Sequence, residues 1–215
     1  AIAAPALAAS IEASAICFGV IGNSGCLPAV SPEPVTAHEI ITSLFIILNY
    51  YIFEIKKVKL MKIYLNSGKV KKEWTDYNGH MNLAFYIHLF DAGWEVLLQK
   101  FNMGEDSAKI EKKTTFAVES HTTYDKEVKE GDEVDINLLF LDRDKKRLIY
   151  KLEMTHKDEG YRAATTEVCS LYVDLNIRKV TEIETDKQNQ IDNFINKNKE
   201  NFDPGNLSLA HKLKK

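Results

Sequence analysis

The stretch that decides the fold is TDYNGHMN at residues 75–82, followed without a gap by LAFYIHLFDAGWEVLLQKF at residues 83–101. The first part is too polar for a core strand and is rich in turn-forming residues. The second part carries apolar side chains at i, i+3, i+4 and i+7 spacing, which predicts a helix buried along its length. Asn82 is a candidate N-cap, and Gly104 lies just beyond the end of the helix. The apolar residues are Leu83, Tyr86, Ile87, Phe90, Trp94, Leu97, Leu98 and Phe101.

Downstream of this helix the apolar pattern changes to that of strands. Four segments rich in Val, Ile, Thr, Tyr and Phe are separated by charged turn sequences, which predicts three successive hairpins. A short strand over residues 69–74 is expected before the polar turn. One long helix and these strands have one economical packing, an α+β fold in which a curved antiparallel sheet wraps the helix. The four segments are residues 114–128, 133–141, 147–156 and 161–173.

The composition is that of an ordinary globular protein, with 215 residues, 45% hydrophobic side chains and a formal net charge of −3. No basic excess exists to attract nucleic acid, so we expect no nucleic-acid partner. Cys17, Cys26 and Cys169 form no CxxC pair and have no zinc spacing, so a reduced, cytoplasmic protein without a metal is the default. The chain also lacks GxGxxG, GxxxxGK[ST], GxSxG and HExxH, which leaves nucleotide-cradling, serine-hydrolase and zincin mechanisms without their required parts.

The first 60 residues differ from the rest in composition. Residues 1–55 contain no Lys or Arg and only four acidic side chains, and the first methionine is Met61. We therefore expect a leader over 1–60, a domain over 61–180 and a polar C-terminal helix or tail over 181–215 that lies on the surface or frays. The leader lacks the positive start of a secretory signal. Its apolar run, residues 40–55, is shorter than the roughly 20 residues of a membrane helix, so an extension without chemistry is favoured over a membrane anchor or a docking element.

The order of helix and strands, the domain length and the segment DYNGHMN at 76–82 resemble the hotdog-fold acyl-CoA thioesterases of the 4-hydroxybenzoyl-CoA thioesterase type. The resemblance covers about residues 66–180 and implies hydrolysis of an acyl-CoA thioester. It implies no cofactor, since coenzyme A enters as part of the substrate, and edge-to-edge pairing into a homodimer or homotetramer. Four further segments are similar to the branch that includes the betainyl-CoA thioesterases of carnitine breakdown: VESH at 118–121, EVKEGD at 127–132, LDRDKKR at 141–147 and YVD at 172–174.

By position, the resemblance gives Asp76 the role of the catalytic carboxylate. Thioester hydrolysis needs a base or a nucleophile beside the carbonyl and donors for the oxyanion. The free amides at the start of the helix, from Asn82 through Leu83 to Ala84, are donors of this kind. Spacing alone also fits an Asx-turn at Asp76.

The neighbouring candidates have structural alternatives. Asn78 and Gly79 hold the turn, and Gly79 also permits positive φ or a close approach of the backbone to a ligand. His80 is a candidate base, a donor to the thioester oxygen or a supporting side chain. Three aromatic residues, Trp74, Tyr86 and Trp94, have the spacing of core residues. Their rings are also of the type that forms a wall around a quaternary ammonium acyl group.

Alternation predicts that Glu119, His121 and Thr123 share one strand face, opposite Phe116, Val118, Ser120 and Thr122. If that face meets the catalytic turn of a neighbouring subunit, Glu119 and His121 line the acyl pocket, and Glu119 favours a cationic acyl group. Otherwise they are a solvated charge pair. Lys145, Lys146 and Arg147 lie at a hairpin, where they are either solvated charge or a patch for the phosphates of coenzyme A. A noncatalytic acyl-CoA-binding module and a scaffold tethered to a membrane through residues 40–55 remain alternative functions.

Overall fold

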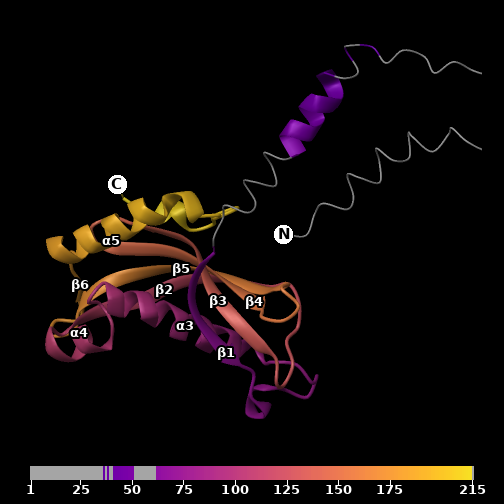
Figure 1. Cartoon of the computed structure of the whole chain (residues 1–215). Helices are drawn as coiled ribbons and strands as arrows, with labels where there is room; N and C mark the ends of the chain where they lie inside the picture. The colour runs from indigo at the N-terminus through magenta and orange to yellow at the C-terminus, as the bar shows by residue number, and fades with distance from the viewer. Residues whose placement is uncertain (1–35, 37, 39–40, 51–61, 215) are drawn as a thin grey trace, which may run out of the picture. The chain divides into compact units, whose positions relative to one another are not determined.

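The computed structural model describes Thr36, His38, residues 41–50 and residues 62–214 (Figure 1). Residues 41–50 form a helix with exposed side chains, and most of the expected leader lies outside the described residues. In the part of the chain that the structure describes, none of the helices combines the length and the apolar character that a membrane crossing requires.

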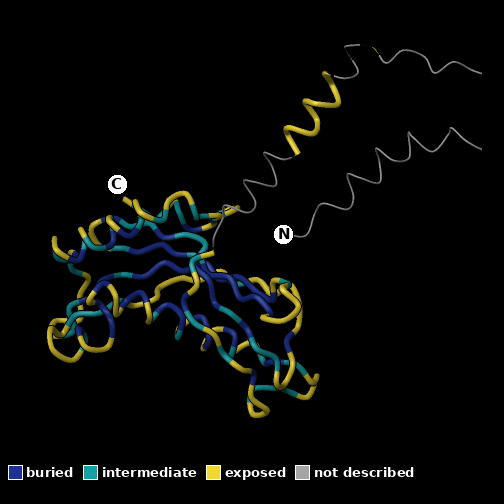
Figure 2. Tube along the Cα trace, viewed as in Figure 1, coloured by how far each residue is buried: buried dark blue, intermediate teal, exposed yellow. Residues whose placement is uncertain are grey.

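Residues 62–214 contain one antiparallel sheet with the strand order β1-β3-β4-β5-β2, and β6 pairs with β5. The predicted hairpins β3–β4 and β4–β5 are confirmed. The hairpin predicted between β2 and β3 is wrong, because β2 crosses to the far edge of the sheet and pairs with β5. The inner strands β4 and β5 are mostly buried, whereas β2 is mostly exposed (Figure 2). The strands are β1 (Ile63–Lys69), β2 (Lys113–Tyr124), β3 (Glu133–Arg143), β4 (Arg147–His156), β5 (Arg162–Asp174) and β6 (Lys179–Val180).

The long helix α3 (Leu83–Lys100) packs against one face of this sheet, which confirms the α+β arrangement (Figure 1). Gly93 lets the helix approach β3 closely, since a Cβ atom there would lie 2.6 Å from Cγ2 of Ile136. Two residues of the predicted apolar stripe, Leu83 and Ile87, are instead exposed, at 62% and 41%. The buried residues of the helix are Tyr86, Leu89, Phe90, Gly93, Trp94, Leu97 and Leu98.

Both ends of α3 are set by local residues. The N-cap prediction is confirmed, because the side chain of Asn82 accepts a hydrogen bond of 3.0 Å from the amide of Ala84. At the other end, Asn102 takes the left-handed conformation with φ 54°. Gly104 has a different role from the one its spacing suggested, since it is the N-cap of a short helix, α4 (Glu105–Ile110).

The strand predicted over residues 69–74 is wrong in position. β1 ends at Lys69, and residues 72–74 form a 3₁₀ turn, η1 (Lys72–Trp74). The chain turns at Val70, whose amide donates to the carbonyl of Asp132 and whose carbonyl accepts from the amide of Gly131. Because these bonds are made to the loop before β3, the ladder between β1 and β3 ends there.

The C-terminal segment packs more firmly than predicted. The helix α5 (Thr185–Asn198) buries Ile191 and Phe194 in the main core, and the ring of Phe194 lies edge-on to Phe101 at 5.5 Å. The short turns η2 (Lys199–Asn201) and η3 (Ala210–Lys212) follow. The predicted polar helix is therefore present and lies on the surface, but it does not fray, because Ile191, Phe194 and the buried Lys187 dock one of its faces.

The chain after α5 covers the outer face of the sheet, opposite to α3. Leu209 packs on Ile149 and Cys169, whose neighbours in β4 and β5 point toward α3. The buried carboxylate of Glu167 accepts hydrogen bonds from the amides of Ser208 and Leu209, at 2.7 and 2.8 Å. These bonds fasten the tail to the sheet.

Candidate active site

The polar turn before α3 is closed by Asp76. One carboxylate oxygen, Oδ1, accepts a hydrogen bond of 2.8 Å from the amide of Asn78. The carbonyl of Asp76 accepts from the amide of Gly79 at 3.0 Å, and the amide of Asp76 donates to the carbonyl of His80 at 3.1 Å. Gly79 has φ +79° and open space around the position of a Cβ atom. The turn thus contains the Asx hydrogen bond, and within residues 62–214 no other hydrogen bond engages the Asp76 carboxylate.

Backbone contacts fix this turn to the sheet and to the helix. The amide of Met81 donates to the carbonyl of Val128 at 2.8 Å, and the side chain of Met81 is buried. The amide of Asn82 donates to the carbonyl of Trp74 at 2.9 Å. The position of Asp76 relative to the start of α3 is therefore set by the main chain on both sides.

These contacts also decide which helix amide can act as an oxyanion donor. The amide of Asn82 is used by Trp74, and the amide of Ala84 is used by the side chain of Asn82. Within residues 62–214 the amide of Leu83 donates to no protein group. Of the three amides expected from the sequence, Leu83 is thus the one open to a ligand, at the positive end of the helix dipole.

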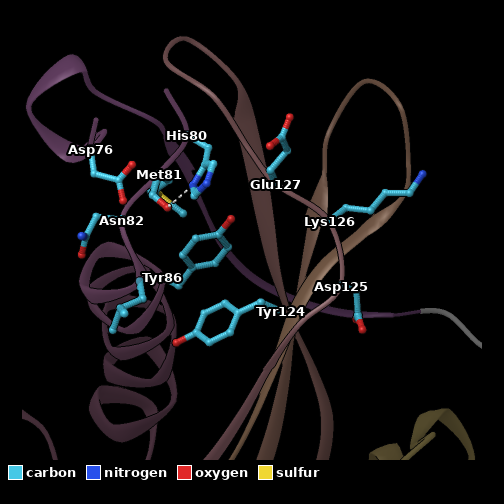
Figure 3. Close-up of a pocket in the computed structure, with 10 residues that line it drawn as sticks. Asp76, His80, Met81, Asn82, Tyr86, Tyr124, Asp125, Lys126 and Glu127 are labelled. Carbon is cyan, nitrogen blue, oxygen red and sulfur yellow. Dashed lines mark hydrogen bonds between the residues drawn. The ribbon is translucent and has the colours of Figure 1, made fainter. Parts of the chain in front are cut away.

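A cavity of about 270 Å³ brings the catalytic candidates together (Figure 3). It is lined by all four candidates that the sequence places in one turn and at the start of one helix: Asp76, His80, Asn82 and Leu83. The rest of the wall comes from Met81 of the turn, from Tyr86 of the helix and from the end of β2 with its following loop. The sequence analysis missed the β2 residues and the loop, since their approach depends on the pairing of β2 with β5. The additional residues are Met81, Tyr86, Tyr124, Asp125, Lys126 and Glu127.

Two tyrosines form the apolar side of this cavity. The rings of Tyr86 and Tyr124 meet edge to face, with centroids 5.1 Å apart and an interplanar angle of 83°. Burial raises the pKa of both hydroxyls above the ordinary value, so both are neutral phenols at pH 7. Tyr86 is 4% exposed and belongs to the core, whereas Tyr124 is 48% exposed.

The charged residues of the wall are mostly paired away from the cavity. Asp125 forms an ion pair of 2.6 Å with Arg162, and the ammonium of Lys126 lies over the ring of Tyr161 at 4.8 Å. In Figure 3, the side chains of Asp125 and Lys126 point away from the two tyrosines. The pKa of Glu127 is lowered, mainly by its hydrogen bond with Lys129.

His80 is half-buried at the rim of the cavity. Its Nδ1 atom lies 3.4 Å from the carbonyl of Met81 (Figure 3). The charge of His80 contributes, after Lys129, to the lowered pKa of Glu127. The geometry therefore fits a supporting role as well as a donor to a bound thioester.

Of the other aromatic candidates, Trp94 lies in the core and Trp74 packs against it, partly buried. The ring of Trp74 stacks on Phe85 with centroids 5.3 Å apart, and the ring of Trp94 stacks on Tyr150 at 3.6 Å. Of the three aromatic residues considered from the sequence, Tyr86 alone lines the cavity.

Glu119 and His121 lie on the outer face of β2 and not beside Asp76. Glu119 forms an ion pair with Lys212 of the C-terminal tail, and His121 lines a separate cavity between the sheet and that tail. Their register partners in β5 are Cys169 and Glu167, which also face the tail. Within the subunit, this placement matches the charge-pair alternative.

A β-bulge changes the face assignment of the other β2 residues. The register shifts between Ala117 and Glu119, so Val118 is the extra residue. After the bulge, Ser120, Thr122 and Tyr124 face α3, and the hydroxyl of Thr122 bonds Thr166 at 2.8 Å. Strict alternation is therefore wrong in grouping Phe116 with Ser120 and Thr122, because one inserted residue inverts the pattern.

The basic residues of the β3–β4 hairpin lie at the other end of the sheet. Arg147 pairs with Leu171 of β5, seven positions from Ala164, the partner of Tyr124. At about 3.3 Å per residue this separation is about 23 Å. Lys145, Lys146 and Arg147 are therefore not brought to the Asp76 cavity within one subunit. Arg147 itself pairs with Asp144 at 2.8 Å.

The comparisons with known proteins agree with this architecture. The sequence profile of the thioesterase-like superfamily matches residues 70–191, more than half of the chain. A betainyl-CoA thioesterase of Pseudomonas aeruginosa is 31% identical over 107 residues, which are 50% of this chain and 67% of that protein. An L-carnitine dehydrogenase/betainyl-CoA thioesterase of Rhizobium meliloti is 33% identical over 112 residues, 52% of this chain and 22% of that protein.

A solved structure is similar to this chain over most of the length of both proteins. A protein of Staphylococcus aureus in complex with CoA superposes with a TM-score of 0.61 and 25% identity, over 72% of this chain and 96% of that one. The profile match and the shared sheet and helix lead to one conclusion. The chain belongs to the thioesterase-like superfamily, and it is a thioester hydrolase with the hotdog fold.

Proposed function

We propose that the protein hydrolyses an acyl-CoA thioester to a carboxylic acid and free coenzyme A, with Asp76 as the general base. One observation carries this proposal: the carboxylate of Asp76 and the open amide of Leu83 line the same cavity at the start of α3. A thioester carbonyl placed there meets a proton acceptor and an oxyanion donor at the same time.

The reaction follows from these two groups. A water molecule attacks the carbonyl carbon while Asp76 takes its proton, and the carbonyl oxygen becomes an oxyanion that accepts a hydrogen bond from Leu83. Collapse of this intermediate breaks the carbon–sulfur bond, and the proton passes from Asp76 to the departing thiolate. The Asx hydrogen bond holds Oδ1 of Asp76 in place, so its other oxygen is the acceptor. His80 supports the site from the rim.

We propose betainyl-CoA as the substrate. The relatives in Pseudomonas aeruginosa and Rhizobium meliloti both carry that activity in their names. The betainyl group is small, and the cavity of about 270 Å³ has an aromatic and acidic wall suited to a small cation.

We further propose a homodimer formed through β2. Within residues 62–214 this strand pairs with β5 along one edge only, and an exposed strand edge favours pairing with a second chain. Apolar side chains gather on β2 and on the exposed part of α3, where a second subunit would cover them: Leu83, Ile87, Phe116 and Val118.

Antiparallel pairing of two β2 strands would place the start of one strand beside the end of the other. The β3–β4 hairpin of the second subunit then lies on the side of the Asp76 cavity. We therefore propose that Lys145 and Lys146 bind phosphates of a coenzyme A held by the other subunit, because Arg147 is already paired with Asp144.

Release of free thiol from a panel of acyl-CoAs tests the proposed activity. We expect turnover, with betainyl-CoA among the best substrates. Binding of acyl-CoAs by calorimetry without thiol release would instead support the noncatalytic binding module. Single turnover in ¹⁸O-labelled water tests the general base, since direct attack by water labels only the released acid. Label in the carboxylate of Asp76 would show a mixed anhydride opened at its aspartyl carbon and would contradict the general base.

A further inference from the structure

We propose that Tyr124 is the residue that selects a quaternary ammonium acyl group, by offering its ring to the cation inside the Asp76 cavity. This inference rests on the proposed thioester hydrolysis and names the side chain that recognises the acyl group. Nothing in the sequence pattern of the polar turn indicated Tyr124, because it lies 48 residues after Asp76.

The chemistry of the substrate restricts where the cation lies. In a betainyl thioester a single methylene separates the trimethylammonium nitrogen from the thioester carbonyl carbon. If that carbonyl lies between Asp76 and the amide of Leu83, the cation lies in the same cavity. The group that recognises it must therefore line this cavity, which excludes the Glu119 of the same subunit, on the outer face of β2.

Tyr124 has the geometry that this task requires. It follows the bulge at Val118, which turns it toward α3, and its ring extends across the cavity toward the start of the helix (Figure 3). It is half-exposed, so its ring is accessible to a ligand, and the buried Tyr86 supports it edge to face at 5.1 Å. A cation within about 6 Å of the centroid of such a ring is attracted by its quadrupole.

One charge of the wall acts in the same direction. Among residues 62–214 the carboxylate of Asp76 forms no ion pair, and it lines the cavity together with Tyr124. The other two acids are paired away from the cavity, Asp125 with Arg162 and Glu127 with Lys129, and the ammonium of Lys126 is held over Tyr161. Asp76 therefore adds to the attraction that the ring of Tyr124 exerts on a cation.

The test compares two substrates that differ in one atom. Betainyl-CoA and 3,3-dimethylbutyryl-CoA have the same shape, but the second has a neutral carbon in place of the nitrogen. We expect the full chain to favour betainyl-CoA in kcat/KM. Tyr124→Leu is expected to lower kcat/KM for betainyl-CoA about 5- to 30-fold and to change the neutral substrate less than about twofold. Tyr124→Phe, which keeps an aromatic face, is expected to keep the preference.

A second series keeps the side-chain shape, so it remains informative if Tyr124→Leu folds poorly. Phenylalanine at position 124 is replaced by its mono-, di- and trifluoro analogues, which weaken the quadrupole stepwise. The logarithm of kcat/KM for betainyl-CoA should fall along the series and stay level for the neutral substrate. Tyr64→Leu is the matched control, since Tyr64 is an exposed tyrosine of β1 outside the cavity.

The outcomes separate this inference from the proposed function. Equal losses on both substrates, or a fluorination series that is level for betainyl-CoA, would overturn the role of Tyr124 while thioester hydrolysis stands. Absence of thiol release from every acyl-CoA tested would overturn the proposed function itself.

Discussion

The Oδ1 atom of Asp76 accepts a hydrogen bond of 2.8 Å from the amide of Asn78, so the carboxylate is tethered to its own turn while it lines the cavity at the start of α3. The Asx-turn and the catalytic role, which compete as explanations of the sequence, are therefore compatible in the structure. The hydrogen bond occupies one oxygen and orients the other.

Asn82 links the site to the stability of the helix. Asn82→Ala removes the cap on the amide of Ala84 and is expected to lower the free energy of unfolding by about 1 kcal/mol. Chemical denaturation measures this loss, and Asn82→Asp, which keeps an acceptor at the N-cap, is the control. An unchanged midpoint in Asn82→Ala would contradict the role of this cap.

Glu119 is expected to affect stability slightly and acyl preference not at all. Glu119→Gln breaks the ion pair with Lys212, which is partly exposed, so the cost should be below about 1 kcal/mol. The ratio of kcat/KM for betainyl-CoA and its neutral analogue should equal that of the unchanged protein. A selective loss on betainyl-CoA would instead place Glu119 in the acyl pocket.

The acid sensitivity of the fold should depend on Asp144. Burial opposes its ionisation, but hydrogen bonds from the amides of Lys214, Lys146 and Arg147 and from the Arg147 side chain outweigh burial and lower the pKa of Asp144 below 3.8. Because the folded-state pKa is the lower one, the stabilisation is complete above about pH 3.8 and is lost as the pH falls through the folded-state pKa.

Asp144→Asn removes this contribution. Its free energy of unfolding is expected to fall at pH 7 and to approach that of the unchanged protein as the pH is lowered below about 3.8. Denaturation curves at several pH values check this, and a deficit that is the same at every pH would show that ionisation of Asp144 does not stabilise the fold.

The domain should fold without the leader. All buried residues of the two core clusters lie at position 65 or later. A chain that starts at Met61 is therefore expected to give the circular dichroism spectrum and melting temperature of a folded domain. If only the full-length chain folded, the boundary drawn from composition would be wrong.

The sequence allowed prediction of those parts of the fold that depend on nearby residues. The helix over 83–100 and its cap at Asn82 follow from apolar spacing and one side chain, and the hairpins of β3, β4 and β5 follow from charged turns between apolar runs. Asp76 and Leu83 are close in the sequence, so their position in the wall of one cavity was predictable for the same reason.

Long-range pairing was not predictable in the same way. The crossing of β2 to β5 and the bulge at Val118 place Tyr124 in the cavity and Glu119 outside it, and neither event has a local signal stronger than alternation. The docking of α5 depends on Ile191 and Phe194, too few apolar residues to stand out in a polar segment.

The most direct test of the account is the kcat for thiol release from saturating betainyl-CoA by Asp76→Asn. Asparagine preserves the hydrogen bond to the amide of Asn78 but cannot take a proton. We expect kcat to fall on the order of 10²-fold or more with binding retained. Asp174→Asn is the matched control, because Asp174 makes the same bond to the amide of Asn176 at 2.8 Å away from the cavity, and its kcat should be unchanged. An unchanged kcat in Asp76→Asn would contradict the central claim and leave Asp76 as a turn residue only.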